Sequence, residues 1–253
     1  SIWQSSFLAV SAFNNAGFSI MQDIPTPGIY NGMISGKFLT LSVLLLIIIG
    51  GLGWPVLVDL YKKRRINRLS LNTKLVLTTS LFLWIIGTCI FVFAEHANTL
   101  THLNFFDKLW HSLFHSVSGR TAGFTTIDFQ SVQDFTKLTY SALMFIGGGS
   151  ASMAGGIKIN AFAIIIVAVI SSLKGRLHPE AFGREVTGQQ VSLALTLGFL
   201  GVASIIVIMT ILNVTEPHVK FLDLLFETIS AFSTNGTSVG VVGTLSNIGN
   251  IIL

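Results

Sequence analysis

Ser118-Gly-Arg-Thr-Ala-Gly123-Phe-Thr-Thr is a polar, glycine-bearing turn that follows a short and mostly apolar segment. The same pattern occurs twice more, in Ser11-Ala-Phe-Asn-Asn-Ala-Gly17-Phe-Ser and in Ser230-Ala-Phe-Ser-Thr-Asn-Gly236-Thr-Ser. The three glycines recur at an interval of roughly 110 residues, and a fixed period of this kind indicates a repeated structural unit. Each turn lies between long hydrophobic segments, so the unit contains a short helix, a turn with an unusual backbone and a membrane span.

The composition of the chain indicates that lipid surrounds most of its surface. Of the 253 residues, 51% are hydrophobic and only 10% are charged, whereas a soluble domain carries about 25% charged residues. The mean hydropathy is +0.74. The single cysteine, Cys89, can form neither an internal disulfide nor a cysteine-based metal cluster. These observations predict an all-α membrane protein.

Hydrophobic segments of two lengths alternate along the chain. The longer ones predict membrane spans at residues 38–60, 75–93, 137–173 and 191–212. The shorter ones are too short to cross a hydrocarbon layer of roughly 30 Å, and they lie at residues 2–12, 105–118 and 221–231. Because a glycine turn follows each short segment at once, we expect three re-entrant half-helices.

Positive charge is concentrated in two short loops. The loops hold nine of the 15 Lys and Arg residues, namely Lys62, Lys63, Arg64, Arg65, Arg68, Lys74, Lys174, Arg176 and Arg184. Short basic loops mark the cytoplasmic side of a membrane, so all three glycine turns are predicted to open from the other side. The basic run at residues 62–65 directly follows a span, which favours contact with anionic lipid or an acidic cytosolic subunit over nucleic acid.

The glycine turns suit the coordination of a dehydrated cation. Inward-pointing backbone carbonyls can replace the water shell of K+ without fixed charge, which lets the ion leave again. Aligning them requires backbone angles that glycine adopts freely. The predicted ion-binding residues are Asn15, Ala16, Gly17, Thr121, Ala122, Gly123, Thr234, Asn235 and Gly236. Each glycine alone is also compatible with a simple helix cap, but three at equal spacing favour a filter.

These motifs resemble the pore loops of a known family. The matching residues are Asn14-Asn-Ala-Gly17-Phe, Arg120-Thr-Ala-Gly123-Phe-Thr-Thr, Ser233-Thr-Asn-Gly236-Thr-Ser and the broken span Gly147-Gly-Gly-Ser…Gly155-Gly-Ile-Lys158. Over essentially the whole chain, the sequence resembles the Trk/Ktr/HKT superfamily of K+ transporters, in particular the membrane subunits of bacterial Ktr systems. The resemblance implies pseudo-fourfold repeats of membrane helix, pore half-helix, filter turn and membrane helix.

The resemblance also implies how the repeats divide this chain. Residues 1–61 would end the second repeat, residues 75–173 would form the third with its broken inner span and gating loop, and residues 191–253 would form a truncated fourth. Cytoplasmic loops at residues 62–74 and 174–190 would join them. The first repeat is expected to be missing from this sequence, which would leave the ring of filter turns open on one side.

The glycine-rich stretch inside the third span predicts a break in the helix. Each glycine destabilises a helix by roughly 1 kcal/mol relative to alanine, and five fall between residues 147 and 156. The resemblance implies that this stretch gates the pore below the filter, with Lys158 competing against the permeating cation. The predicted gate residues are Gly147, Gly148, Gly149, Ser150, Gly155, Gly156 and Lys158. The alternative is a close-packed helix crossing that uses small residues.

Charged residues near the turns need partners, because an unpaired charge at membrane depth is expensive. We expect Arg120 to brace the filter through a salt bridge to Glu227, with Asp128 as a second candidate. Asp23, Glu95 and Glu216 are expected to be solvated and could attract cations to the outer mouth.

Together, these features predict a K+ transporter or channel-like subunit, not an enzyme. The resemblance implies a multi-pass protein of the bacterial inner (plasma) membrane, a homodimer, and a cytosolic nucleotide-binding regulatory ring of the KtrA type that takes ATP or ADP. K+ is the expected substrate ion, Na+ is a further possibility, and no organic cofactor is expected.

Two other functions remain open. Ser150 in the broken helix, with His111 and His115 in a half-helix, suggests an intramembrane serine protease, although a protease gives no reason for three similar turns. A Na+/K+ channel with weak selectivity is the second.

Overall fold

The computed structural model describes residues 2–20, 36–176 and 178–253, so Asp23 lies outside the described residues. The helices are α1 (Ile2–Phe13), α2 (Gly36–Leu52), α3 (Trp54–Lys63), α4 (Leu71–Glu95), α5 (Phe105–Ser118), α6 (Asp134–Phe145), α7 (Ile159–Leu173), α8 (Gly188–Thr215), α9 (Phe221–Phe232) and α10 (Asn247–Ile252). Short 3-10 turns are η1 (Ile66–Arg68) and η2 (Val242–Thr244), and the two-residue strands β1 (Glu180–Ala181) and β2 (Arg184–Glu185) form a small hairpin. Among the described residues, the regular secondary structure is therefore helical apart from this hairpin and an isolated bridge between Ile146 and Ile157.

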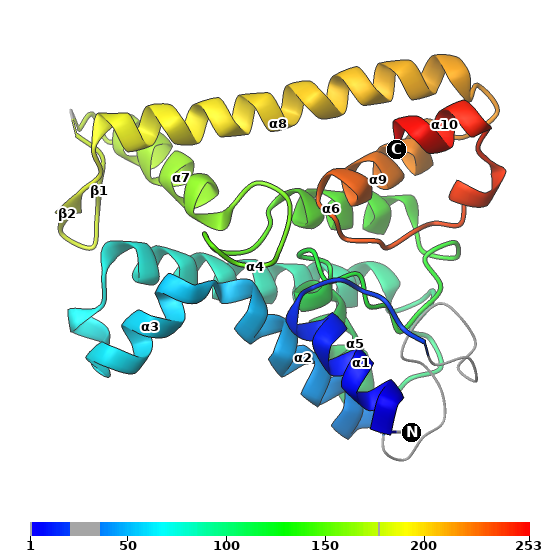
Figure 1. The fold of residues 1–253 in the computed structure, drawn as a ribbon, viewed down its shortest axis with the longest axis horizontal. Helices are drawn as coiled ribbons and strands as arrows, with labels where there is room; N and C mark the ends of the chain where they lie inside the picture. The colour runs from blue at the N-terminus through cyan, green and yellow to red at the C-terminus, as the bar shows by residue number, and fades with distance from the viewer. Residues whose placement is uncertain (1, 21–35, 177) are drawn as a thin grey trace.

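Two long helices run along the length of the molecule. In Figure 1, α8 follows the upper edge and α4 crosses the middle, with α6, α7 and α9 between them. Helix α4 has 25 residues and α8 has 28, and each contains a stretch of 18 residues that is apolar enough to lie in a membrane. At 1.5 Å per residue, both exceed the roughly 30 Å of hydrocarbon in a bilayer. The spans predicted at residues 75–93 and 191–212 are confirmed as helices, each longer at both ends.

The span predicted at residues 38–60 is not one straight helix. Helix α2 ends at Leu52, and α3 leaves at an angle of 94°. Between them, Gly53 has a φ of 86°, and Pro55 occupies the first turn of α3. Proline lacks the N–H needed to continue the hydrogen bonds of α2, so the chain turns a corner here, which we call the elbow (residues 51–54).

The three short segments are helical, as expected. Helices α1, α5 and α9 have 12, 14 and 12 residues, which corresponds to lengths of roughly 18–21 Å. The third span is broken between Phe145 and Ile159. Within the break, Gly147 N donates to Ile157 O at 2.8 Å and Ile157 N donates to Phe145 O at 3.1 Å. These bonds draw the two ends of the break together and leave the residues between them as a loop.

Glu95 and Glu216, expected at the outer mouth, are buried instead. Glu95 at the end of α4 accepts the backbone N–H of Gln133, the N-cap of α6, at 3.0 Å. Glu216 at the end of α8 accepts the backbone N–H of Ser246, the N-cap of α10, at 3.1 Å. Each carboxylate therefore fixes the start of a later helix, where unpaired N–H groups and the helix dipole attract negative charge.

A buried ion pair joins α6 to the half-helix α9. Lys137 Nζ lies 2.7 Å from Asp223 Oδ1, and the two side chains are only 9% and 16% exposed. Replacing Lys137 by methionine would leave the carboxylate of Asp223 buried without its cation, which typically costs about 3–5 kcal/mol.

We therefore expect Lys137→Met to lower the thermal unfolding midpoint of the detergent-solubilised protein clearly. The matched control is Lys37→Met, because the Lys37–Asp107 pair at 2.6 Å leaves the lysine 74% exposed. Exposed pairs contribute little, so equal midpoints for the two variants would contradict this account.

Candidate functional site

The three glycine turns share one backbone conformation. In each turn two residues separated by one other have a positive φ, as Asn15 (51°) and Gly17 (71°), Thr121 (94°) and Gly123 (74°), and Thr234 (54°) and Gly236 (80°) show. Positive φ is uncommon for residues other than glycine. Its recurrence at the same positions after α1, α5 and α9 shows that the three turns are built alike.

The same turns meet in space. A Cβ atom built on Gly123 would lie 1.8 Å from Asn235 O, and one built on Gly17 would lie 2.7 Å from Ala122 O. The sequence-predicted residues Gly17, Ala122, Gly123 and Asn235 are therefore brought together, with backbone facing backbone. Such close approach explains why glycine is required at the first two turns.

Side chains of the half-helices hold two of the turns in place. Ser118 Oγ donates to Phe124 O at 2.5 Å, and Ser230 Oγ donates to Thr237 O at 2.7 Å. In both cases the accepting carbonyl belongs to the residue after the turn glycine. The amide of Asn235 also donates to Thr237 Oγ1 at 2.8 Å. The hydroxyls thus fix the direction in which each turn leaves its helix.

The arrangement of turns is open on one side. A hollow of about 610 Å³ is lined by residues of the first turn and of the third, among them Asn15, Ala16, Thr234 and Gly236. Among the described residues, nothing lies within 4 Å of a Cβ built on Gly236. The third glycine therefore faces the hollow instead of packing on a neighbouring turn.

The glycine-rich loop lies between the elbow and the third turn. Gly149 N donates to Gly51 O at 2.8 Å, and Trp54 N donates to Ala151 O at 3.3 Å. On the other side, a Cβ built on Gly155 would lie 2.3 Å from Ser233 O. The loop is thus non-helical, as predicted. It is also closely packed, a feature that was expected of the alternative, in which small residues allow two segments to cross at short distance.

The other predicted gate residues support this packing. Three of the glycines leave no room for a side chain, because a Cβ atom built on each would clash with a backbone carbonyl oxygen. The distances would be 1.8 Å from Gly147 to Gly155 O, 2.6 Å from Gly148 to Gly51 O and 2.1 Å from Gly149 to Leu52 O. Gly156 has a φ of 65°, Lys158 Nζ donates to Ala154 O, and Ser150 N donates to the side chain of Asn160 at 3.0 Å. Asn160 in turn donates to Asn72 of α4, a link that the sequence did not reveal.

The predicted salt bridge between Arg120 and Glu227 or Asp128 is wrong. Arg120 is 6% exposed, and its Nη2 donates to Gly147 O at 2.7 Å. Glu227 instead accepts Ser238 Oγ at 2.6 Å and Val239 N at 2.9 Å, and Asp128 accepts Gln130 N. The carbonyls just after α6 have no N–H partner within the helix and carry partial negative charge, so they take the place of a carboxylate. Glu227 therefore contacts the segment that follows the third turn, through the hydroxyl of Ser238 and the backbone N–H of Val239.

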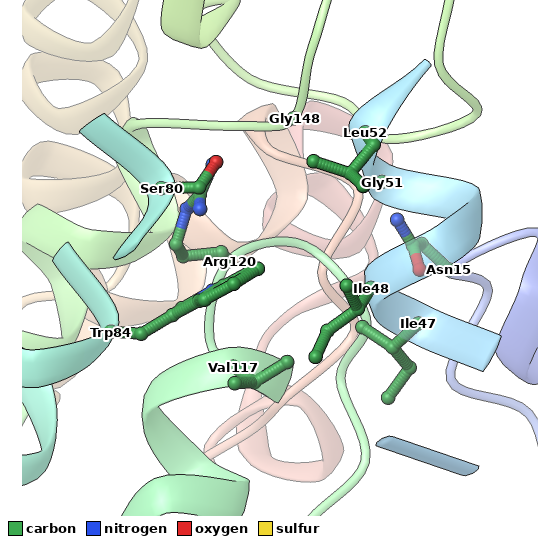
Figure 2. A pocket seen from close by; sticks show the side chains of 10 residues that line it. All are labelled: Asn15, Ile47, Ile48, Gly51, Leu52, Ser80, Trp84, Val117, Arg120 and Gly148. Atoms are coloured by element: carbon green, nitrogen blue, oxygen red, sulfur yellow. The ribbon is translucent and has the colours of Figure 1, made fainter. Parts of the chain in front are cut away.

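A small cavity adjoins the guanidinium of Arg120. Figure 2 shows the Arg120 side chain reaching from its turn toward Ser80, with the Trp84 indole beside it and Asn15 and Gly148 farther around the cavity. The space open to the centre of a water molecule is about 20 Å³, which suffices for one water. The cavity therefore touches the first turn, the second turn and the loop at once.

The residues of the protease alternative are not arranged as a dyad. His115 is fully buried, and its Nε2 lies 2.8 Å from Thr126 Oγ1. His111 Nδ1 lies 2.8 Å from the same hydroxyl. The contacts described for Ser150 are with Asn160 and the elbow. The histidines thus serve to hold the segment that follows the second turn.

Comparison with known proteins identifies the family. Residues 1–253 match the TrkH family model, described as a cation transport protein. The chain belongs to the TrkH family. The Ktr system potassium uptake protein B of Bacillus subtilis is 38% identical over 254 residues, which cover 100% of this chain and 56% of that protein. The potassium/sodium uptake protein NtpJ of Enterococcus hirae is 35% identical over 256 residues, with the same two shares.

The fold of this chain is similar to that of a solved structure. The crystal structure of the potassium transporter TrkH from Vibrio parahaemolyticus matches with a TM-score of 0.69 and 18% identity, over 96% of this chain and 52% of that chain. This TrkH family chain spans about half the length of the relatives it matches. The family and the long apolar helices together indicate a membrane protein.

Proposed function

We propose that this chain forms three of the filter turns of a K+ transporter, in which backbone carbonyls replace the water shell of the ion. The observation that carries the proposal is the approach of Gly17 and Gly123 to the carbonyls of Ala122 and Asn235. Carbonyl rings of this kind select and release cations because they carry no fixed charge. The half-helices α1, α5 and α9 end at the turns, so their negative dipole ends add to the attraction.

The same proposal gives the loop of residues 146–158 the role of a gate. The loop contacts the third turn through Gly155 and carries Lys158, whose positive charge would compete with a cation beneath the filter. In Figure 1, the end of α3 and the β1–β2 hairpin lie at the same end of the molecule, on the left. Both belong to the basic loops, which supports a cytoplasmic location for that end in a multi-pass bacterial inner-membrane protein.

The open side of the site supports a fourth turn supplied by further sequence. A hollow of about 610 Å³ between the first and third turns has room for another peptide turn, and four turns would complete a pseudo-fourfold ring. Glu95 and Glu216 each lie at the end of a long helix and accept the N-cap N–H of a later helix, and this recurrence supports the repeat architecture. The proposal also includes the division of the chain into the second, third and fourth repeats, which the loops at residues 62–74 and 174–190 separate.

The relatives suggest the partners and the ions. The name Ktr system, given to the Bacillus subtilis relative, supports a multi-subunit assembly. We propose a homodimer that carries a KtrA-type nucleotide-binding ring on the cytoplasmic side and is surrounded by membrane lipid. The name of the Enterococcus hirae relative includes sodium, which keeps a weakly selective Na+/K+ channel as the second candidate.

Flux measurements on the full-length protein in liposomes test the proposal. We expect uptake of radioactive Rb+ into K+-loaded vesicles, with unlabelled K+ competing at a concentration about tenfold or more below that of Na+. Equal competition by the two ions would favour the weakly selective channel. No uptake above that of empty vesicles would contradict transport altogether.

A further inference from the structure

Arg120 belongs to the second turn, but its side chain ends on the proposed gate. Its Nη2 donates to Gly147 O at 2.7 Å, and its Nε lies 3.5 Å from Ile146 O. These carbonyls are the first two after α6, where no further helical N–H group is available to them. A single side chain therefore connects the filter turn that starts at Thr121 with the first residues of the loop.

The contact is charge-assisted and largely sheltered from water. Arg120 is 6% exposed, and its Cζ lies 5.8 Å from the centre of the Trp84 ring. The ion pairs found among the described residues all involve other cations. Hydrogen bonds from a guanidinium are stronger than neutral ones. The carbonyl of Gly147 is therefore the main direct partner of this charge.

The cavity beside the guanidinium makes the contact separable. The loop lies on one side of Arg120, and on another lies the space of about 20 Å³ that Ser80 and Asn15 also line (Figure 2). A guanidinium that left Gly147 O would thus meet polar groups and a water-sized space instead of tightly packed hydrocarbon. The Arg120 side chain can therefore occupy two positions, one bound to Gly147 O and one in the cavity. A side chain with two such positions can couple the filter turn to the loop.

We propose that Arg120 is a latch that holds the loop against the second filter turn and keeps the passage closed. The inference rests on the proposed function of residues 146–158 as a gate. Arg120 acts through the loop and is thus a positioning residue. Because it directly precedes Thr121, any shift of the filter turn moves the latch, so the occupancy of the turn and the opening of the gate are coupled.

Thiol labelling of the loop in the full-length protein tests the latch. Ala154 is 2% exposed, so a cysteine in its place should react with a hydrophilic thiol reagent only when the loop leaves its seat. Ala154→Cys is introduced into a protein with Cys89 and any other cysteine replaced. We expect Arg120→Gln to raise the labelling rate about tenfold or more, as loss of a charge-assisted hydrogen bond predicts.

Two further variants frame the measurement. Arg120→Lys keeps the charge but lacks the planar fork, and we expect an intermediate rise. Arg176→Gln makes the same chemical change on an exposed side chain that pairs with Glu180, and we expect the labelling rate of the parent. In Arg120→Gln, Rb+ flux should rise with labelling while the preference for K+ over Na+ stays unchanged.

Each result decides between the latch and the function on which it rests. An unchanged labelling rate in Arg120→Gln, or in Arg120→Lys if the former does not assemble, contradicts the latch. Faster labelling without more flux would show that Arg120 holds the loop but that the loop does not close the passage, which contradicts the proposed gate. A loss of ion preference together with faster labelling would show that Arg120 shapes the filter, and it would overturn the latch.

Discussion

Gly123→Ala is expected to abolish K+ uptake by the full-length protein. The new Cβ would lie 1.8 Å from Asn235 O, and the φ of 74° is unfavourable for alanine. One turn would have to move away from another, so that the carbonyls would no longer converge on the position of the ion. We expect at least a hundredfold loss of K+ uptake in K+-auxotrophic cells, with the protein still present in the membrane.

Gly183→Ala is the matched control for this substitution. Gly183 has a φ of 70°, close to that of Gly123, but apart from its own chain neighbours none of the described residues comes within 4 Å of a Cβ built on it. The control carries the same backbone strain, of order 1 kcal/mol, without the steric clash. If both variants took up K+ normally, the convergence of the turns would have no bearing on transport.

Deletion of residues 148–155 is expected to raise the basal ion flux. The deletion removes the part of the loop that packs on the elbow and on Ser233, while Ile146 and Ile157, which already pair side by side, remain to close the gap. If the loop blocks the passage, the flux of Rb+ in liposomes should rise about tenfold or more, because closed states of such equilibria commonly exceed open ones by that factor.

The deletion is interpreted with a double variant. When the deletion is combined with Gly123→Ala, the increased flux should disappear, because the ions would still have to cross the filter turns. Flux that persists in the double variant would show a leak around the site. Unchanged flux in the single deletion would contradict the proposal that the loop is a gate.

The helices were largely predictable because hydrophobic length alone separates spans from half-helices. Residues 105–118 were expected as a half-helix and form α5 with those bounds. The elbow was missed, although Gly50-Gly-Leu-Gly53-Trp-Pro55 carries the helix-breaking residues that mark it. Hydropathy averaged over the length of a span does not reveal a change in the direction of the helix.

The candidate site was predictable only in part. Repetition of the turns indicated which glycines would meet, because equivalent units tend to occupy equivalent positions around an axis. The partners of buried charges could not be obtained in this way. Arg120 binds helix-end carbonyls, and Glu95 and Glu216 bind helix-start N–H groups. Such backbone partners leave no mark in a sequence, whereas opposite charges do, and this led to the wrong pairing of Arg120 with Glu227.

The length of α8 has a consequence for the hairpin that precedes it. Its apolar stretch, residues 191–212, corresponds to about 33 Å, which is long enough to cross a hydrocarbon layer of roughly 30 Å. The first turn of α8 holds Gln189 and Gln190, and Thr187 and Gln190 cap it reciprocally. This polar turn therefore extends beyond the apolar stretch, toward the polar side of the membrane surface. In the proposed membrane arrangement, the β1–β2 hairpin that precedes this turn lies in the aqueous phase, where a water-soluble protein can reach it without touching lipid tails.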